Sequence, residues 1–285
     1  MSETQQVQWF PGHMAKTRRK IQESLPLVDG IVELRDSRIP ISSINPELNE
    51  LIGSKPKMIL LNKCDLADEN ATKQWLDHYS SEGIIALAAD CRSGKGLNAF
   101  RKTVNVLLKD TIAKNEARGM AGKPLKLMVV GIPNTGKSSF INRMTKNGKA
   151  KVEDRAGVTR NNQWYVIENG IHLLDTPGVL WPKFDDPDTG KKLAFTGGIK
   201  DEILDKEELA ISLLDILARD YPERLTERYK VTDFSEMDGW ELLQYIGKKR
   251  GMLVSGGEVD TLRAATTLFD ELRGGKLGKI TFERP

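Results

Sequence analysis

Short apolar runs alternate with segments of helical spacing along the first half of the chain. The apolar runs are residues 57–61, 84–88 and 127–130, and residues 28–34, which also contain two acidic residues, form a further predicted short strand. The helical segments that follow them are residues 45–53, 71–79, 97–108 and 137–144. An apolar run of strand length followed by a pattern of period 3.6 is typical of βα units. We therefore predict an α/β fold with a mostly parallel, six-stranded sheet flanked by helices.

Four further segments depart from this alternation. Residues 163–168 and 171–174 are rich in β-forming residues, and the Asn-Gly pair between them predicts a two-residue hairpin turn. These two strands are expected to be antiparallel neighbours at a sheet edge. Residues 109–124 and 179–200 lose the apolar pattern and gain charge, glycine or proline. We expect a helix end with a linker in the first and a mobile loop in the second.

The last third of the chain shows helical periodicity only. Helices are expected over residues 203–217, 240–246 and 259–272. Their predicted buried faces consist of Leu209, Leu213, Ile216, Leu262, Ala265 and Phe269. The predicted organisation is a basic N-terminal segment (1–24), an α/β domain (25–200) and a helical domain (201–285).

Composition and charge narrow the class of protein. A length of 285 residues suits about two domains with their own cores. The net charge of +3 means that a nucleic-acid partner would have to contact local basic patches. Cys64 and Cys91 cannot make a disulfide framework and lack metal-ligand spacing. Because no apolar run reaches the length of a membrane span or forms a signal-peptide core, we expect a cytoplasmic protein that contacts no membrane.

The run at residues 127–130 leads into the string G-x-x-x-x-G-K-S and then into a helix. A strand, a glycine loop and a helix in this order are the context of a phosphate-binding loop. Gly131 and Gly136 let backbone N–H groups turn toward phosphate oxygens, and the helix adds the positive end of its dipole. Lys137 is expected to contact the β- and γ-phosphates and Ser138 to ligate Mg²⁺. The alternative is a glycine-rich turn without a ligand, which this context disfavours.

Other predicted strand ends carry motifs that suit other parts of a guanine nucleotide. In N-K-x-D at residues 62–65, Asp65 can accept hydrogen bonds from both N1–H and the exocyclic amine of guanine. In D-x-x-G at residues 175–178, Asp175 can hold a water on Mg²⁺ and the Gly178 N–H can meet the γ-phosphate. Thr159 lies in a polar segment that can bring its hydroxyl to Mg²⁺. Together these motifs predict a GTP site with two switch loops that hydrolysis releases.

The order of the motifs is unusual, because N-K-x-D precedes the phosphate loop and in conventional GTPases it follows. The chain is therefore predicted to be circularly permuted. With W-F-P-G-H-M-A-K at 9–16, D-S-R-I-P at 36–40 and D-T-P-G-V-L-W-P-K-F at 175–184, it resembles the bacterial ribosome biogenesis GTPase A family of the TRAFAC class. The resemblance covers essentially the whole chain, including Y-P-E-R-L at 221–225.

The resemblance implies a function, partners and site residues. It implies a GTPase that binds a late precursor of the large (50S) ribosomal subunit and its rRNA, promotes maturation and leaves after hydrolysis, and is a monomer off the ribosome. The implied catalytic positions are His13, Lys137, Thr159 and Gly178. Mg²⁺ is implied at Ser138, Thr159 and Asp175, and K⁺ at Asn134. The implied contacts to GTP or GDP are Asn62, Lys63, Asp65, Asp90, Cys91, Asn134, Thr135, Gly136, Lys137, Ser138, Ser139, Thr159, Asp175 and Gly178.

The sequence departs from the usual motifs at three places. Val179 and Leu180 replace the glutamine that often follows D-x-x-G, so slow turnover is expected until the large subunit docks and His13 is arranged. The S-A-K-like segment that supports the base reads Asp90-Cys91-Arg92. The P-G-x-T switch motif reads A-G-V-T at 156–159. The second departure leaves the particular side-chain contact to guanine open, and the third is expected to loosen the loop without removing the Thr159 oxygen.

Alternative interpretations remain for several features. His13 could pack or bind RNA, and Asn134 could only shape its loop. The basic helix of residues 9–24 could be a solvated surface, and residues 36–38 could be an ion-paired loop instead of a ligand contact. At the level of function, the alternatives are an RNA-binding protein that uses GTP to order its fold, and a GTPase in tRNA modification or ion transport.

Overall fold

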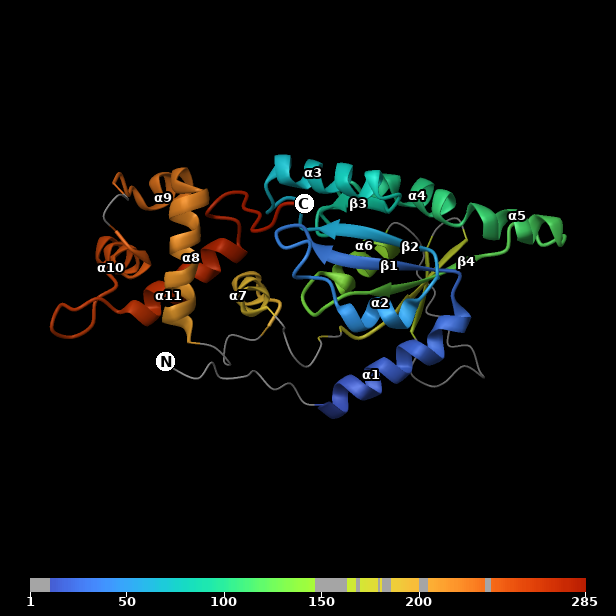
Figure 1. Ribbon diagram of the computed structural model, residues 1–285, viewed down its shortest axis with the longest axis horizontal. Helices are drawn as coiled ribbons and strands as arrows, with labels where there is room; N and C mark the ends of the chain where they lie inside the picture. Colours follow the sequence, from blue (N-terminus) through green and yellow to red (C-terminus); the bar gives the residue numbers. More distant parts are fainter. Residues whose placement is uncertain are drawn as a thin grey trace. The chain divides into compact units, whose positions relative to one another are not determined.

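The chain forms two compact units, Met1–Phe184 with Glu283–Pro285 and Asp185–Phe282 (Figure 1). The computed structural model describes residues 11–146, 163–167, 170–178, 180, 186–199, 205–233 and 237–285, together with their side chains except at 11–14 and 146. Within these ranges no helix has both the length and the apolar character needed to cross a membrane.

The first unit is built on a sheet whose described strands number six, in the order β3-β2-β1-β4-β6-β5. The strands are β1 Gly30–Asp36, β2 Lys57–Asn62, β3 Ile85–Ala89, β4 Leu125–Val130, β5 Trp164–Ile167 and β6 Ile171–Asp175. All neighbours are parallel except β5 and β6. The predicted fold class is therefore confirmed. Because the other five strands are parallel, their carboxyl ends share one edge, and the segments that follow them gather there.

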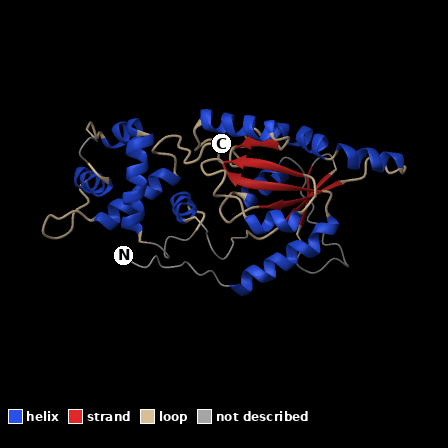
Figure 2. Ribbon diagram, in the orientation of Figure 1, coloured by secondary structure: helices blue, strands red, loops and turns tan. Residues whose placement is uncertain are grey.

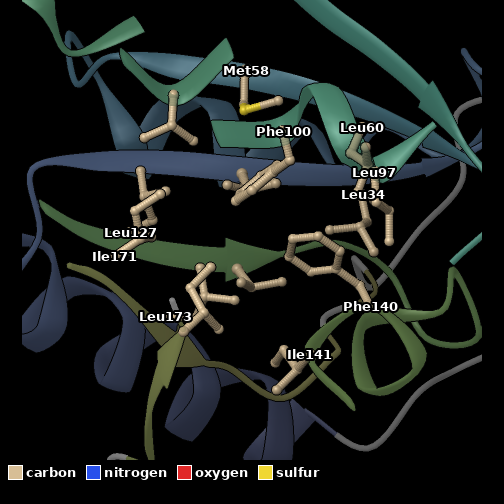
Figure 3. Packing of buried hydrophobic residues seen from close by; sticks show 14 of the residues in the cluster. Leu34, Met58, Leu60, Leu97, Phe100, Leu127, Phe140, Ile141, Ile171 and Leu173 are labelled. Carbon is tan, nitrogen blue, oxygen red and sulfur yellow. The ribbon is translucent and has the colours of Figure 1, made fainter. Parts of the chain in front are cut away.

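Helices cover both faces of the sheet (Figure 2). They are α1 Pro11–Ser24, α2 Pro46–Ile52, α3 Glu69–Ser81, α4 Phe100–Leu107, α5 Lys109–Ala117 and α6 Lys137–Lys146, with short 3₁₀ turns at Leu25–Leu27 and Leu97–Ala99. On one face, Phe100 of α4 and Phe140 of α6 pack edge to face with ring centroids 5.2 Å apart (Figure 3). On the other face, α1, α2 and α3 bury Ile21, Leu48 and Trp75. Burial on both faces explains why β2 and β4 contain the continuous apolar stretches 58–61 and 127–130.

The structure confirms the hairpin and changes the view of the linker. Strands β5 and β6 pair antiparallel, and Gly170 has the positive φ of 75° that a tight hairpin turn favours. The segment expected to be a helix end and linker instead contains the separate helix α5, whose Ile112 packs against the core while half-buried.

The second unit is helical, as predicted. Its described helices are α7 Pro187–Thr196, α8 Lys206–Asp220, α9 Pro222–Tyr229, α10 Gly239–Lys249 and α11 Thr261–Arg273. Four of the predicted inward residues are buried, and they are Leu209, Leu213, Ala265 and Phe269. Ile216 is half-buried. The prediction for Leu262 is wrong, because its position on α11 leaves it 55% exposed.

Helix α7 lies where a mobile loop was expected over residues 179–200, so that expectation is wrong for Pro187–Thr196. Asp186 caps the helix, with its side chain accepting a hydrogen bond from the Asp188 N–H at 3.0 Å. Leu193 and Phe195 are fully buried. One cap and one apolar stripe therefore outweigh a composition rich in glycine and charged residues.

Candidate functional site

The phosphate-loop motif connects the end of β4 to the start of α6 at the centre of the sheet. Its two glycines have left-handed or near-extended positive φ values, 151° at Gly131 and 96° at Gly136. A Cβ atom on Gly131 would lie 2.6 Å from the Leu34 carbonyl oxygen, and one on Gly136 would lie 2.2 Å from Asn62 Nδ2. Glycine is therefore required at both positions, because a side chain there would clash with residues at the carboxyl ends of β1 and β2.

Asn62, at the end of β2, joins the phosphate loop to the loop after β3. Its Nδ2 donates to the Thr135 carbonyl at 2.7 Å, and its Oδ1 accepts from the Cys91 N–H at 2.9 Å. Asn62 is 3% exposed and Thr135 is 1% exposed, so both hydrogen bonds are shielded from water. Three motifs that are far apart in the sequence are thus held together by one amide side chain.

Lys137 lies at the mouth of the loop with its ammonium group close to backbone carbonyls. Nζ donates to the Gly131 carbonyl at 3.0 Å and the Ile132 carbonyl at 2.9 Å. Burial lowers the pKa of Lys137 to about 8, although the Asp175 carboxylate opposes that shift. A Cβ atom on Gly178 would lie 3.0 Å from Nζ. A poorly hydrated ammonium group, beside backbone of the D-x-x-G segment, suits an incoming phosphate.

Asp175 and Ser138, the predicted Mg²⁺ ligands, carry oxygen atoms of the kind that Mg²⁺ prefers. Burial raises the pKa of Asp175 at the end of β6, and Lys137 works against that rise. The next residue, Thr176, donates from Oγ1 to the Val129 carbonyl at 2.7 Å and so fixes the strand end beside β4. Ser138 is exposed at the first turn of α6. A carboxylate and a hydroxyl fit a cation that takes its other oxygens from phosphate and water.

Within the described ranges no cluster of three or more His, Cys, Asp or Glu side chains can hold a metal ion. The Asp175 and Ser138 pair is consistent with this result, because Mg²⁺ at nucleotide sites relies on one or two protein groups and on substrate phosphates. The residues present therefore fit magnesium that arrives with a nucleotide, and they do not form a closed metal cage.

The base-reading motif is arranged around a buried loop from β1. Lys63 has a left-handed backbone (φ 62°), and its Nζ lies 3.0 Å from Asp36 Oδ2. Asp65 is partly exposed, and the Arg92 guanidinium lies 3.9 Å from its carboxylate. Burial raises the pKa of the Cys91 thiol to about 12, which leaves it a neutral group at physiological pH. Asp65 is therefore presented toward solvent while the residues beside it are fixed.

The other residues of the predicted site lie on the same loops. Asp90 accepts from the Arg92 N–H at 2.8 Å, an interaction that shapes the loop after β3. Asn134 is exposed and has a left-handed φ of 60°, and Ser139 is exposed on the first turn of α6. Thr159 lies outside the described residues. His13 belongs to α1, and its side chain lies outside the described part of the chain.

For residues 36–38 the structure shows the ion-paired alternative. Arg38 Nε and NH2 donate to the two carboxylate oxygens of Asp36 at 2.9 and 2.8 Å, and both residues are buried. Ser37 Oγ donates to the Asn62 carbonyl at 2.7 Å. Sequence reasoning missed that this loop supports Asn62 and Lys63. A signal was present in the charged residues at the carboxyl end of β1, next to β2 in a parallel sheet.

The low pKa of Lys137 predicts proton uptake when nucleotide binds. Phosphate oxygens favour the charged amine, so the pKa rises above 8 in the complex. At pH 8, GDP binding is expected to take up about 0.5 proton, and at pH 7 about 0.1. The affinity for GDP is therefore highest below pH 8 and falls as the pH rises above 8. Calorimetry in two buffers of different ionisation enthalpy measures the uptake, and equal heats in both buffers at pH 8 would contradict it.

Comparison with known proteins agrees with this geometry. A family model described as 50S ribosome-binding GTPase matches residues 126–244. The chain is 45% identical over 279 residues to ribosome biogenesis GTPase A of Bacillus cereus, covering 98% of this chain and 94% of that protein. It is 33% identical over 279 residues to ribosome biogenesis GTPase A of Thermotoga maritima, covering 98% of this chain and 95% of that protein.

Solved structures show the same fold. GDP-bound YlqF matches with a TM-score of 0.69 at 30% identity, over 94% of this chain and 99% of that one. GNP-bound YlqF from T. maritima matches with a TM-score of 0.64 at 29% identity, over 95% of this chain and 98% of that one. These similarities make the protein a GTP-hydrolysing enzyme with a role in ribosome biogenesis. The chain belongs to the ribosome biogenesis GTPase A family.

Proposed function

We propose that this chain is a cytoplasmic, monomeric GTPase that binds a late precursor of the large (50S) ribosomal subunit, promotes its maturation and leaves after hydrolysis. The observation that carries the nucleotide part is the pair of hydrogen bonds by which Asn62 joins the phosphate loop and the loop after β3. The 50S partner is supported by the family model and by the names of the relatives.

In this proposal each loop contacts one part of GTP. Asp65 accepts from guanine, with Asn62, Lys63, Asp90 and Cys91 shaping its surroundings. Asn134, Thr135, Gly136, Lys137, Ser138 and Ser139 contact the phosphates through backbone N–H groups and side chains. Ser138, Thr159 and Asp175 would hold Mg²⁺, which neutralises charge on the phosphates, and Gly178 would donate to the γ-phosphate. Asn134 is the proposed K⁺ ligand.

Hydrolysis is proposed to be slow without the ribosome. The position two residues after Gly178 is Leu180, a buried apolar residue that cannot orient a water molecule. His13 is the proposed group that orients this water once the large subunit docks. Lys16, Arg18 and Arg19 of α1 are exposed and offer positive charge for rRNA phosphates.

The helical unit carries basic residues at positions 248–250, 273, 276 and 279, which are further candidates for rRNA contact. Arg250 forms an ion pair with Glu271 at 3.0 Å, and Arg273 donates to the Phe195 carbonyl at 3.1 Å, so both guanidinium groups hold the fold together. Lys248 and Lys276 are exposed. We propose that these lysines, together with Lys249, contribute to rRNA binding in this unit.

GTP turnover measured with and without purified large subunits, in K⁺ and in Na⁺, tests the proposed function. We expect turnover to rise about 10²–10⁴-fold with large subunits in K⁺, because one positioned side chain that takes part in proton transfer typically contributes a factor of this size. We expect a smaller rise in Na⁺. Turnover that stays at the basal level with large subunits would favour an RNA-binding protein that uses GTP to order its fold.

The matched variant in this experiment is His13→Ala. Its basal turnover should equal that of the unaltered protein, because His13 is proposed to act only after docking, whereas the ribosome-stimulated part should be lost. Co-sedimentation with large subunits separates a loss of binding from a loss of catalysis. Full stimulation of His13→Ala would remove the catalytic role of His13 and leave the GTPase assignment in place.

A further inference from the structure

The segment Glu283–Pro285 follows the helical unit in the chain but belongs to the first unit. Glu283 is only 5% exposed. Its carboxylate accepts from the Ile41 N–H at 2.5 Å and the Ser42 N–H at 3.1 Å, and also from the Ser42 hydroxyl. A buried carboxylate is stable only when such donors surround it. The loop after β1 thus supplies the hydrogen-bond donors that hold the Glu283 carboxylate.

Two more contacts fix the same segment to helix α3. Trp75 Nε1 donates to the Glu283 carbonyl at 3.1 Å. The Arg284 guanidinium lies 3.8 Å from the carboxylate of Asp68, which also caps α3 by accepting from the Ala71 N–H at 2.8 Å. Helix α3 is the first element after the N-K-x-D motif. The segment therefore contacts structure on both sides of that motif, the loop after β1 and the start of α3.

The loop that Glu283 holds also supports the base-reading residues. The Asp36 N–H donates to Ser43 Oγ at 3.2 Å, which ties the end of β1 to the part of the loop next to Ser42. At its other end, the loop contacts N-K-x-D twice: Ser37 Oγ donates to the Asn62 carbonyl at 2.7 Å, and Asp36 pairs with Lys63 at 3.0 Å. A continuous series of buried contacts thus leads from Glu283 to N-K-x-D.

We propose that Glu283 is a positioning residue for guanine recognition: by holding the loop after β1 and, through its neighbour, the start of α3, it sets the place of Asp65. The inference rests on the proposed contact between Asp65 and guanine. Asp65 is partly exposed, and its surroundings are fixed by Lys63 before it and Asp68 after it. Its carboxylate can meet both guanine donors only if these flanking residues hold the turn in place.

In this proposal the peptide chain links the helical unit directly to a residue that positions Asp65. Glu283 follows directly on Phe282, the last residue of that unit. A partner that engages the helical unit and displaces residues 283–285 would therefore weaken nucleotide binding without touching the phosphate loop. This route is separate from the chain connection that leads into the unit at Asp185.

The test compares Glu283→Gln and Ser42→Ala with the unaltered protein, using GDP and inosine diphosphate, which lacks the exocyclic amine. In Glu283→Gln one of the two carboxylate acceptors becomes an NH₂ donor, so a single neutral oxygen is left to accept from the Ile41 and Ser42 N–H groups, and the charge that strengthens these hydrogen bonds is lost. We expect GDP affinity to fall about fivefold, a change of about 1 kcal/mol, and IDP affinity to fall less. In turnover assays KM should rise while kcat is unchanged. Ser42→Ala should act in the same direction more weakly.

Glu258→Gln is the matched control, since Glu258 is exposed in the helical unit. It should leave both affinities unchanged. Equal losses for GDP and IDP, or no loss in either variant, would overturn the proposal. If Glu283→Gln fails to fold, Ser42→Ala alone decides, because it removes only a hydroxyl. These outcomes are independent of stimulation by large subunits, so the inference can fail while the proposed function stands.

Discussion

An Asp65→Asn variant is expected to bind GDP about 100-fold more weakly than the unaltered protein, a change of about 2.7 kcal/mol. A carboxylate accepts two hydrogen bonds from guanine N1–H and the exocyclic amine, and charge-assisted bonds of this kind contribute about 1.5–3 kcal/mol each. Asparagine offers one acceptor and one donor, so a donor faces a donor. The Arg92 guanidinium 3.9 Å away compensates for neither loss. Titration calorimetry with GDP measures the change.

The same variant should gain affinity for xanthosine diphosphate, because xanthine carries a carbonyl where guanine carries the amine, and the asparagine NH₂ can donate to it. Asp77→Asn is the control, since Asp77 is exposed on α3 and lies away from the loop. Its GDP affinity should stay the same. A GDP affinity that is equal in Asp65→Asn and the unaltered protein would refute the base contact, even if hydrolysis persists.

The sequence predicts the strands that carry the candidate nucleotide motifs, because strand ends are strong local signals. An apolar run that stops at Gly131 or Asn62 identifies a strand and its carboxyl end from neighbouring residues alone. Since these strands are parallel, their ends meet at one edge, and the convergence of N-K-x-D, the phosphate loop and D-x-x-G follows from topology. The pairing of β1 with β4, distant in the chain, is visible only in the structure.

Contacts between segments that carry no periodic signal could not be predicted. Lys63 pairs with Asp36, and Glu283 with Ser42, across long stretches of chain, and the sequence gives no sign of which charge faces which. Helix α7 was missed because its cap and its buried Phe195 outweigh a composition typical of loops. The exposure of Leu262 shows that periodicity can also predict too much burial, since an apolar residue at a helical spacing need not face the core.

Replacing Asp36 with asparagine is expected to lower the free energy of unfolding by about 3 kcal/mol, because breaking a buried ion pair leaves an uncompensated charge. Asp36 is 3% exposed and Arg38 is 1% exposed, so the guanidinium would stay buried beside a neutral amide. Burial alone would raise the pKa of Asp36, but Arg38 and Lys63 outweigh it and hold that pKa far below its usual range. Urea unfolding of the nucleotide-free protein at pH 7 measures the loss.

The direction of the pKa shift fixes how this effect depends on pH. A carboxyl group whose pKa is depressed in the folded state contributes its full stability above the unfolded pKa of about 3.9, and the contribution is lost as the pH falls toward the folded value. The difference between Asp36→Asn and the unaltered protein should therefore be constant from pH 7 to pH 5 and shrink at pH 3.5. Asp110→Asn, at an exposed site on α5, should change stability little at any pH.

A double variant, Asp36→Asn with Arg38→Met, separates the buried charge from the shape of the loop. It removes the guanidinium together with its partner, so most of the stability should return. Lys63 would still lack its carboxylate, so we expect GDP affinity below that of the unaltered protein in both Asp36→Asn and the double variant, although the double variant has its fold restored. If the double variant is no more stable than Asp36→Asn, the cost arises from lost packing or from Lys63, and the buried ion pair is not what holds this loop.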